Sequence, residues 1–229
     1  MAAASPPIDP RSALLAGASG LVGRSLLSLL LDSPRYCRVQ ILLRRPVPDL
    51  ASDPKLAAAV VDFAALPPLP PVDDVFIALG TTIRAAGSQE AFRRVDFDAV
   101  LATARAGRAA GAKRLLVVSA LGADAASNLF YNRVKGEMQQ AVAALGYESV
   151  VIAQPSLLLG DRASIGQPKR AGEEWAQRLL RPLLGWVPAR VRPIEAGDVA
   201  GAMLRAALEA RPGVRIVRSG DMQPHRTRS

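Results

Sequence analysis

The sequence predicts a single α/β domain built on a doubly wound parallel sheet. Short apolar runs alternate with helical stretches along the chain, which is the pattern of parallel strands joined by crossover helices. Apolar residues make up 50% of the chain and aromatic residues only 4%, so Ala, Val and Leu must fill the core. Such cores suit strands that helices cover on both faces. The length of 229 residues fits one large α/β domain, or one domain with a small appendage.

The first half of the chain supplies four strands, each a short apolar run bounded by turn-forming residues. These strands are expected at residues 12–16, 38–43, within 56–61, and at 75–79. The helix expected at 21–31 has apolar residues at helical spacing and stops near Ser33-Pro34. The third strand is expected to follow a short helix, and the four prolines between residues 66 and 72 predict a loop.

The second half continues the alternation of strands and helices. Strands are expected at residues 114–119, 149–153 and 213–217, and helices at 89–110, 128–145, 173–180 and 198–209. Gly111 and Gly146 close the first two helices, as glycines commonly do. Pro155 ends the strand at 149–153, and Asp198 is the expected N-cap of the last helix. A polar tail is expected from Arg218.

The domain organisation follows from these elements. We expect a disordered segment at residues 1–11, one domain at 12–220 with a small substrate region at about 156–197, and a flexible tail at 221–229. Residues 1–10 contain three prolines and no apolar stretch, which argues against a signal peptide. No apolar run reaches the length of a transmembrane helix, which is about 18 residues. A monomer or a homodimer is expected.

Composition excludes several function classes. The chain has one cysteine, Cys37, and one histidine, His225, so it offers no zinc cluster and no metal site is expected. A Ser-His-Asp hydrolase would need a histidine within the folded body. The net charge is +9, but the basic residues are scattered and aromatic residues are few, so we expect no dedicated nucleic-acid site. The absence of disulfides is compatible with the reducing cytoplasm, which is the expected location.

A glycine-rich loop lies between the first expected strand and helix. Gly17, Gly20 and Gly23 form G-x-x-G-x-x-G, where the chain must turn sharply, admit a pyrophosphate and pack the helix closely on the sheet. The N–H groups of the helix N-terminus, together with its dipole, suit phosphates. The expected binding residues of this loop are Gly17, Ser19, Gly20, Leu21, Val22 and Gly23. The sequence therefore predicts a dinucleotide site of the Rossmann type.

The end of the second strand indicates which dinucleotide is preferred. Enzymes that prefer NAD usually carry an acid there, which accepts a hydrogen bond from the ribose 2′-hydroxyl. This strand instead ends in Arg44 and Arg45, whose guanidinium groups match a 2′-phosphate. NADP(H) is therefore favoured over NAD(H). Asp62 and Phe63 follow the third strand, where an acid commonly meets the adenine edge.

A serine, a tyrosine and a lysine form the expected catalytic set. Tyr131 and Lys135 stand four residues apart on one expected helix and so share a face. A nearby ammonium favours the phenolate, so the tyrosine can exchange a proton with a substrate oxygen. Ser119 ends the preceding strand at the carboxyl edge, where sites of open sheets lie, and its hydroxyl could bind the same oxygen.

The glycine loop, Ser119 and the Tyr131–Lys135 pair together resemble the short-chain dehydrogenase/reductase superfamily. A longer run is similar to its atypical branch, which contains the animal HIV-Tat-interacting oxidoreductase and small bacterial relatives. That run includes Ala78-Leu79-Gly80-Thr81-Thr82, Phe92-Arg93-Arg94-Val95-Asp96, Gly122-Ala123-Asp124 and Val134-Lys135-Gly136-Glu137. The likeness covers roughly residues 13–161.

The resemblance implies further roles. Leu79, Gly80, Thr81 and Thr82 would flank the ribose, Lys135 would bind the nicotinamide ribose, and Pro155 would wall the nicotinamide pocket. Many members place an asparagine, which supports a proton relay, where this chain has Asp96. The short chain after Pro155 disfavours a sugar-nucleotide substrate.

Two functions remain open from the sequence. The first is an NADPH-dependent reductase of a small carbonyl or related acceptor that uses Ser119, Tyr131 and Lys135. The alternative is an NADP(H)-binding redox-sensing or regulatory protein with little turnover. A third idea is that residues 179–191 lie on a membrane surface or cover a substrate, although the favoured interpretation of this segment is a helix end packed on the core.

Overall fold

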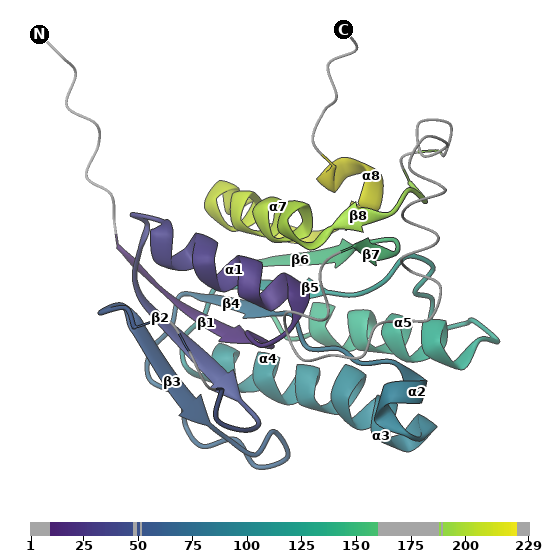
Figure 1. Ribbon diagram of the computed structural model, residues 1–229, viewed down its shortest axis with the longest axis horizontal. Helices are drawn as coiled ribbons and strands as arrows, with labels where there is room; N and C mark the ends of the chain where they lie inside the picture. Colours follow the sequence, from purple (N-terminus) through teal and green to yellow (C-terminus); the bar gives the residue numbers. More distant parts are fainter. Residues whose placement is uncertain (1–9, 48–49, 51, 160–187, 189, 224–229) are drawn as a thin grey trace, which may run out of the picture.

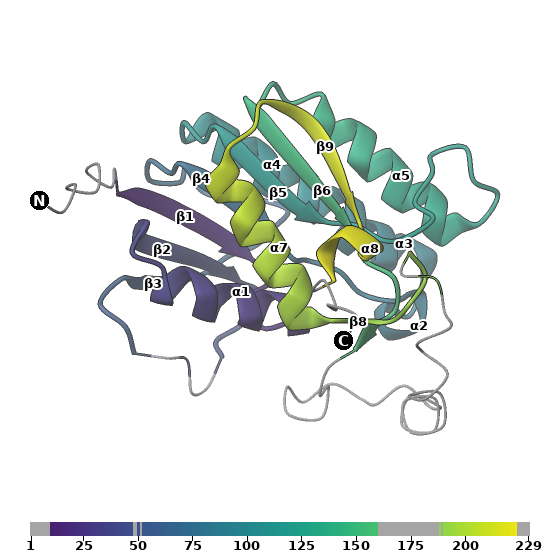
Figure 2. The ribbon, with the colours of Figure 1, turned by 90° about the horizontal axis from the view of Figure 1, so that it is seen from above.

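The computed structural model describes residues 10–47, 50, 52–159, 188 and 190–223. Its centre is a seven-stranded parallel sheet in the order β3-β2-β1-β4-β5-β6-β9 (Figures 1 and 2, with β9 labelled in Figure 2). The strands are β1 (Arg11–Ala16), β2 (Tyr36–Leu43), β3 (Leu56–Val60), β4 (Asp74–Ile77), β5 (Arg114–Val118), β6 (Ser149–Gln154) and β9 (Gly213–Arg218). β7 (Leu158–Leu159) and β8 (Ile194–Glu195) form a separate parallel pair. The predicted doubly wound fold is confirmed.

Helices cover both faces of the sheet. The longer ones are α1 (Leu21–Asp32), α4 (Val100–Ala109), α5 (Phe130–Ala143) and α7 (Ala196–Glu209). The short ones are α2 (Ile83–Ala86), α3 (Gln89–Arg93) and α8 (Ser219–Met222). α1 and α7 lie side by side on one face, and α4 and α5 lie on the other (Figures 1 and 2). No helix among the described residues is long and apolar enough to span a membrane.

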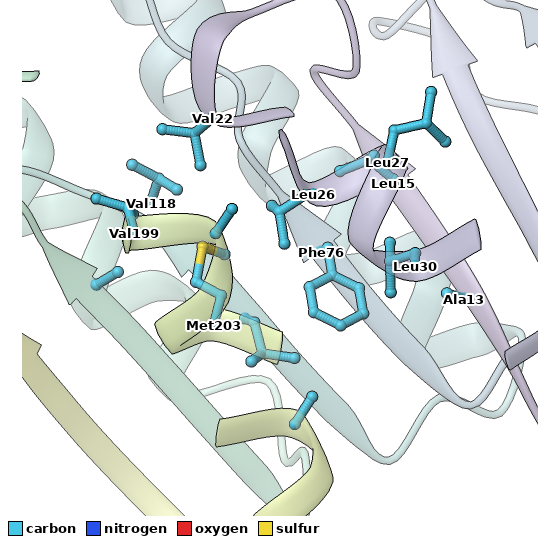
Figure 3. Close-up of a cluster of buried hydrophobic side chains, with 14 of the residues drawn as sticks. Ala13, Leu15, Val22, Leu26, Leu27, Leu30, Phe76, Val118, Val199 and Met203 are labelled. Atoms are coloured by element: carbon cyan, nitrogen blue, oxygen red, sulfur yellow. The ribbon is translucent and has the colours of Figure 1, made fainter. Parts of the chain in front are cut away.

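Two apolar layers hold the helices to the sheet. Alternate residues of a strand point to opposite faces, so neighbouring positions of β1 enter different layers. Ala13 and Leu15 pack with Leu26 of α1 and Met203 of α7 (Figure 3). Leu14 instead packs in the layer that faces α4 and α5. Because both faces of the inner strands are buried, these strands read as continuous apolar runs in the sequence.

The expected helix at residues 89–110 is not one regular helix. It consists of α3, a π-helical segment η1 (Arg94–Ala99) and α4. The wider π turn includes Asp96, whose side chain is fully buried. π-helical turns within α-helices occur frequently at functional sites. The helical spacing of apolar residues in the sequence could not reveal this π-helical segment, because the residues on both sides of it are also helical.

Three smaller expectations are also corrected. β3 follows a turn in which the Lys55 N–H donates to the Asp53 carboxylate, at 2.8 Å, and not a short helix. Glu195, and not Asp198, is the N-cap of α7, because β8 leads directly into the helix. The polar stretch after β9 begins with the short helix α8. The expected helix at 173–180 and the surface idea for 179–191 fall outside the described residues, except for residues 188, 190 and 191.

A buried polar cluster joins the strands at the amino edge of the sheet. Asp74 at the start of β4 is completely buried and accepts a hydrogen bond from the Tyr36 hydroxyl at 2.6 Å. Arg114 binds the same carboxylate, and a nitrogen of Arg11 lies 3.5 Å from it. Burial, together with the neighbouring carboxylate, raises the pKa of Tyr36, so this phenol remains a hydrogen-bond donor.

Replacing Asp74 with alanine is expected to lower the free energy of unfolding by about 3–5 kcal/mol, because two arginines and a buried phenol lose their shared partner. Urea unfolding of both proteins measures the difference. Tyr36→Phe removes one hydrogen bond to a charged group and should cost less, about 1.5–3 kcal/mol. Equal stability of Asp74→Ala and the unmodified protein would contradict a structural role for this cluster.

Candidate functional site

The glycine loop joins β1 to α1, as its position in the sequence predicts. Gly17 has a φ of +94°, and a Cβ atom added there would lie 2.5 Å from the carbonyl carbon of Ala78. A Cβ on Gly23 would lie 1.9 Å from the Gly17 oxygen. The loop therefore passes directly over the end of β4, and the first helical turn packs closely on the loop. Both glycines are required by packing alone.

Gly20 differs from these two glycines, because packing does not require a glycine at its position. It is the N-cap of α1 with an ordinary φ of −84°, and an added Cβ would meet the Gly17 oxygen at 3.4 Å and the Ala78 oxygen at 4.0 Å, which are ordinary contacts. The first turn of α1 has no side-chain cap and no acidic residue. The N–H groups of the first helical turn have no intrahelical acceptor. The loop thus offers the start of α1, including Leu21 and Val22, to an anion, and the exposed Ser19 lies beside it.

Arg44 and Arg45 lie beside this loop. They follow β2 directly, and pairing of Ala16 with Leu42 brings the ends of β1 and β2 together. Both arginines are exposed. This arrangement places two exposed arginine residues at the same sheet edge as the start of α1.

Asp62 and Phe63, which follow β3, lie in different surroundings. The Asp62 carboxylate is exposed and accepts a hydrogen bond from the Ala64 N–H at 2.9 Å, so it stabilises its own turn. The Phe63 ring is buried in the apolar layer below α4, together with Val72. The Phe63 side chain therefore serves packing, which leaves only its backbone for a nucleotide.

Leu79, Gly80, Thr81 and Thr82 form the loop after β4. Thr82 is the N-cap of α2 and accepts a hydrogen bond from the Ala85 N–H at 3.1 Å. The Thr81 N–H donates to Oδ2 of Asp96 at 2.9 Å. Leu79 packs against the apolar layer, while Gly80 is exposed. The loop is thus fixed at both threonines and leaves Gly80 open at the sheet edge.

Lys135 is buried and paired. Its Nζ lies 2.7 Å from Oδ1 of Asp96, and the two side chains are 3% and 0% exposed. A buried ammonium requires such a partner. The sequence analysis noted Asp96 only because many members of the resembled superfamily have asparagine at that position. It did not predict this ion pair, because the spacing of apolar residues does not reveal the π-helical turn that contains Asp96.

Ser119 follows β5 and belongs to a buried chain of hydrogen bonds. The Gln139 side-chain amide donates to Oγ of Ser119 at 2.6 Å, and the amide of Gln154 donates to Oε1 of Gln139 at 3.2 Å. Because Oγ accepts from Gln139, the serine hydroxyl keeps its own proton for another acceptor. Sequence reasoning missed Gln139. Its position four residues after Lys135 was an available signal, because it continues the same helix face.

Tyr131 lies on the same helix, α5, and is half-buried. Its ring centroid is 5.3 Å from that of Phe92. Within the described part of the chain, its hydroxyl has no hydrogen-bond partner, so no hydrogen bond joins it to Ser119 or Lys135. The other tyrosines are committed elsewhere: Tyr147 donates to the Ala104 carbonyl at 2.6 Å, and burial raises the pKa of this phenol as it does that of Tyr36.

These segments share one edge of the sheet. All strands of the main sheet run parallel, so the loops after β1, β2, β4, β5 and β6 meet at the carboxyl edge. The chain order reverses between β1 and β4, and sites of open α/β sheets lie at such a switch point. Pro155, after β6, is buried, and its carbonyl accepts from the Leu121 N–H at 2.9 Å. In the described residues, no group of three His, Cys, Asp or Glu side chains could hold a metal ion.

Solved structures share this fold, and one of them contains NAD. MoeE5 in complex with UDP-glucose and NAD superposes with a TM-score of 0.67 at 21% identity, covering 90% of this chain and 75% of that one. A short-chain dehydrogenase/reductase family oxidoreductase from Burkholderia thailandensis gives 0.66 at 20% identity, covering 93% and 92%. At these identities, the likeness shows a shared Rossmann fold.

Comparison of sequences shows closer relatives, although no family model matches the chain. The protein fmp52, mitochondrial, of Emericella nidulans is 37% identical over 210 residues, covering 87% of this chain and 88% of the relative. The same-named protein of Aspergillus fumigatus is 37% identical over 218 residues, covering 92% and 89%. FMP52 of Candida albicans is 31% identical over 201 residues, covering 82% and 84%.

These relatives correct one expectation and establish a family. The expected cytoplasmic location is contradicted, because the names of the relatives place them in mitochondria. Composition and the lack of disulfides distinguish reducing from oxidising surroundings, but they do not distinguish one reducing compartment from another. Identity above 30% over most of both chains shows that this protein belongs to the Fmp52 family.

Proposed function

We propose that this protein is an NADP(H)-dependent oxidoreductase that reduces a small carbonyl or related acceptor. The observation that carries the proposal is the start of α1: it lacks an acidic residue and a side-chain cap, and Gly20 there is not required by packing. These residues fit a pyrophosphate, which needs free N–H groups and close backbone approach. The NAD complex of the fold neighbour MoeE5 supports the same class of ligand.

Each side chain would have a distinct task. The start of α1 would hold the pyrophosphate, Arg44 and Arg45 would hold the 2′-phosphate, and Lys135 would bind the nicotinamide ribose. When bound, the nicotinamide supplies the hydride, and the protein orients it. Ser119 would donate a hydrogen bond to the substrate oxygen, since its Oγ already accepts one from Gln139. Tyr131 would transfer the proton.

The alternative is an NADP(H)-binding protein with redox-sensing or regulatory function and little turnover. The ion pair of Asp96 with Lys135 favours it to some extent, because a paired ammonium exerts less influence on Tyr131. The Ser119, Tyr131 and Lys135 set favours the enzyme. The resemblance to the branch of the HIV-Tat-interacting oxidoreductase is compatible with both.

The first test is the intact mass and absorbance spectrum of the purified protein, which show whether a dinucleotide accompanies it. Calorimetry with NADPH and NADH then measures affinity directly. A screen of aldehydes, ketones and quinones with NADPH measures turnover. Turnover of a carbonyl compound supports the enzyme. Tight NADPH binding without turnover of any acceptor supports the alternative, and no binding of either dinucleotide contradicts both.

Replacing Arg44 and Arg45 together with alanine is expected to abolish the preference for NADPH over NADH. Each lost charged hydrogen bond should cost about 1.5–3 kcal/mol of NADPH binding, while NADH, which has no 2′-phosphate, should be little affected. Calorimetric titration with both dinucleotides measures the difference. Arg38→Ala is the matched control, because Arg38 is also exposed but lies near the amino end of β2. Equal affinities of the unmodified protein for the two dinucleotides would refute this role.

A further inference from the structure

The Asp96–Lys135 ion pair lies at the carboxyl edge of the sheet. A Cβ atom added to Gly80 would lie 3.4 Å from Oδ1 of Asp96 and 3.8 Å from Nζ of Lys135. Gly80 itself is exposed and lies three residues after the end of β4. The ion pair therefore lies immediately beneath the backbone that faces the proposed cofactor site, although both side chains are buried.

Asp96 connects two elements that border this site. Its Oδ2 accepts a hydrogen bond from the Thr81 N–H in the loop after β4, and its Oδ1 lies against the ammonium on α5. Oδ1 makes no well-aligned hydrogen bond with any group in the described residues, so its interaction with Lys135 is mainly one of charge. Asp96 can thus both position Lys135 and cancel its charge.

The neutralised charge has a consequence for cofactor binding. The oxidised nicotinamide ring carries one positive charge, and the reduced ring carries none. A buried ammonium without a partner would oppose the oxidised ring and leave the reduced ring unaffected, and this effect is strong where water is excluded. The other ion pair that joins these elements, Arg93 with Glu137, is 40% and 31% exposed and already balanced, so it adds little.

We infer that Asp96 is a positioning residue that sets the relative affinity of this site for oxidised and reduced NADP by neutralising Lys135. This inference rests on the proposed function, because it requires Lys135 to lie at the nicotinamide ribose. It assigns to Asp96 a task that the serine, tyrosine and lysine set does not perform. The carboxylate keeps the site usable by both forms of the cofactor, which any enzyme that turns over its cofactor requires.

The test is the ratio of the Kd for NADP⁺ to the Kd for NADPH. Asp96→Asn retains an acceptor for the Thr81 N–H but removes the charge, and it should raise this ratio about fivefold or more, mainly through weaker NADP⁺ binding. A fivefold change corresponds to about 20 mV in the potential of the bound two-electron couple. Calorimetry with each form of the cofactor gives both constants without any substrate.

The matched control is the double variant Asp96→Asn with Lys135→Met. Neither residue of this variant is charged, and the intact ion pair has no net charge either. The ratio of the Kd for NADP⁺ to the Kd for NADPH should therefore return to within about twofold of its value in the unmodified protein. Both affinities should fall, because the ammonium no longer reaches the ribose. Circular dichroism and thermal unfolding establish that each variant is folded.

The outcomes distinguish failure of this inference from failure of the proposed function on which it rests. A raised ratio in Asp96→Asn that returns in the double variant supports the inference. An unchanged ratio in a folded Asp96→Asn protein overturns it, even if both affinities fall together, since that pattern reveals only positioning. If the unmodified protein binds neither form, the proposed function itself fails.

Discussion

Replacing Tyr131 with phenylalanine is expected to lower the rate of carbonyl reduction about 10²–10⁴-fold, which is the usual cost of losing general acid/base catalysis. NADPH affinity should hardly change, because the substitution removes only the hydroxyl and keeps the ring that packs against Phe92. In the described part of the chain, that hydroxyl has no hydrogen-bond partner, so its loss should also leave stability nearly unchanged. Steady-state oxidation of NADPH with an acceptor from the screen measures the rate.

Tyr147→Phe is the control for Tyr131→Phe. Tyr147 is buried, and its hydroxyl donates to the Ala104 carbonyl at 2.6 Å. Its removal should lower the free energy of unfolding by about 1 kcal/mol and leave the rate unchanged. The two variants should therefore affect different quantities. If Tyr131→Phe turned over a genuine substrate at the original rate, the proton would have to come from another group.

Replacing Gly20 with aspartate is expected to abolish dinucleotide binding. Gly20 is the N-cap of α1, a position where aspartate is favourable, since its carboxylate can accept from the free N–H groups of the first turn. The new carboxylate would therefore occupy the place proposed for the pyrophosphate and repel it. We expect a loss of about 3 kcal/mol or more, which is roughly 100-fold in NADPH affinity by calorimetry.

The same substitution should not destabilise the fold, which makes the result easy to interpret. The φ of −84° at Gly20 suits any residue, and a Cβ there would make only ordinary contacts. Thermal unfolding should thus show an equal or higher Tm. Gly20→Asn is the matched control, because asparagine is an equally good N-cap but adds no charge, and it should weaken binding less. Undiminished NADPH affinity in folded Gly20→Asp would refute the location of the pyrophosphate.

The sequence alone determined the fold class and much of the edge where the site lies. Apolar runs such as residues 114–119 could be recognised because strands buried on both faces carry apolar side chains at every position. The glycine loop could be recognised because a sharp turn, a close helix and an anion all require the same small residue. Ser119, Arg44 and Arg45 followed from these elements, since each lies directly after a strand. The serine's position after β5 and the arginines' position after β2 are confirmed.

Only the tertiary structure decided which polar side chains meet. Asp96 and Lys135 are separated by 39 residues, and they pair because a π-helical turn directs Asp96 toward α5. Gln139, Gln154 and Ser119 come from three elements and join only when β5, β6 and α5 are packed together. Apolar periodicity reports which face of an element is buried, but a hydrogen bond depends on a match of a few tenths of an ångström between distant segments. That match arises from packing, which no local pattern of residues specifies.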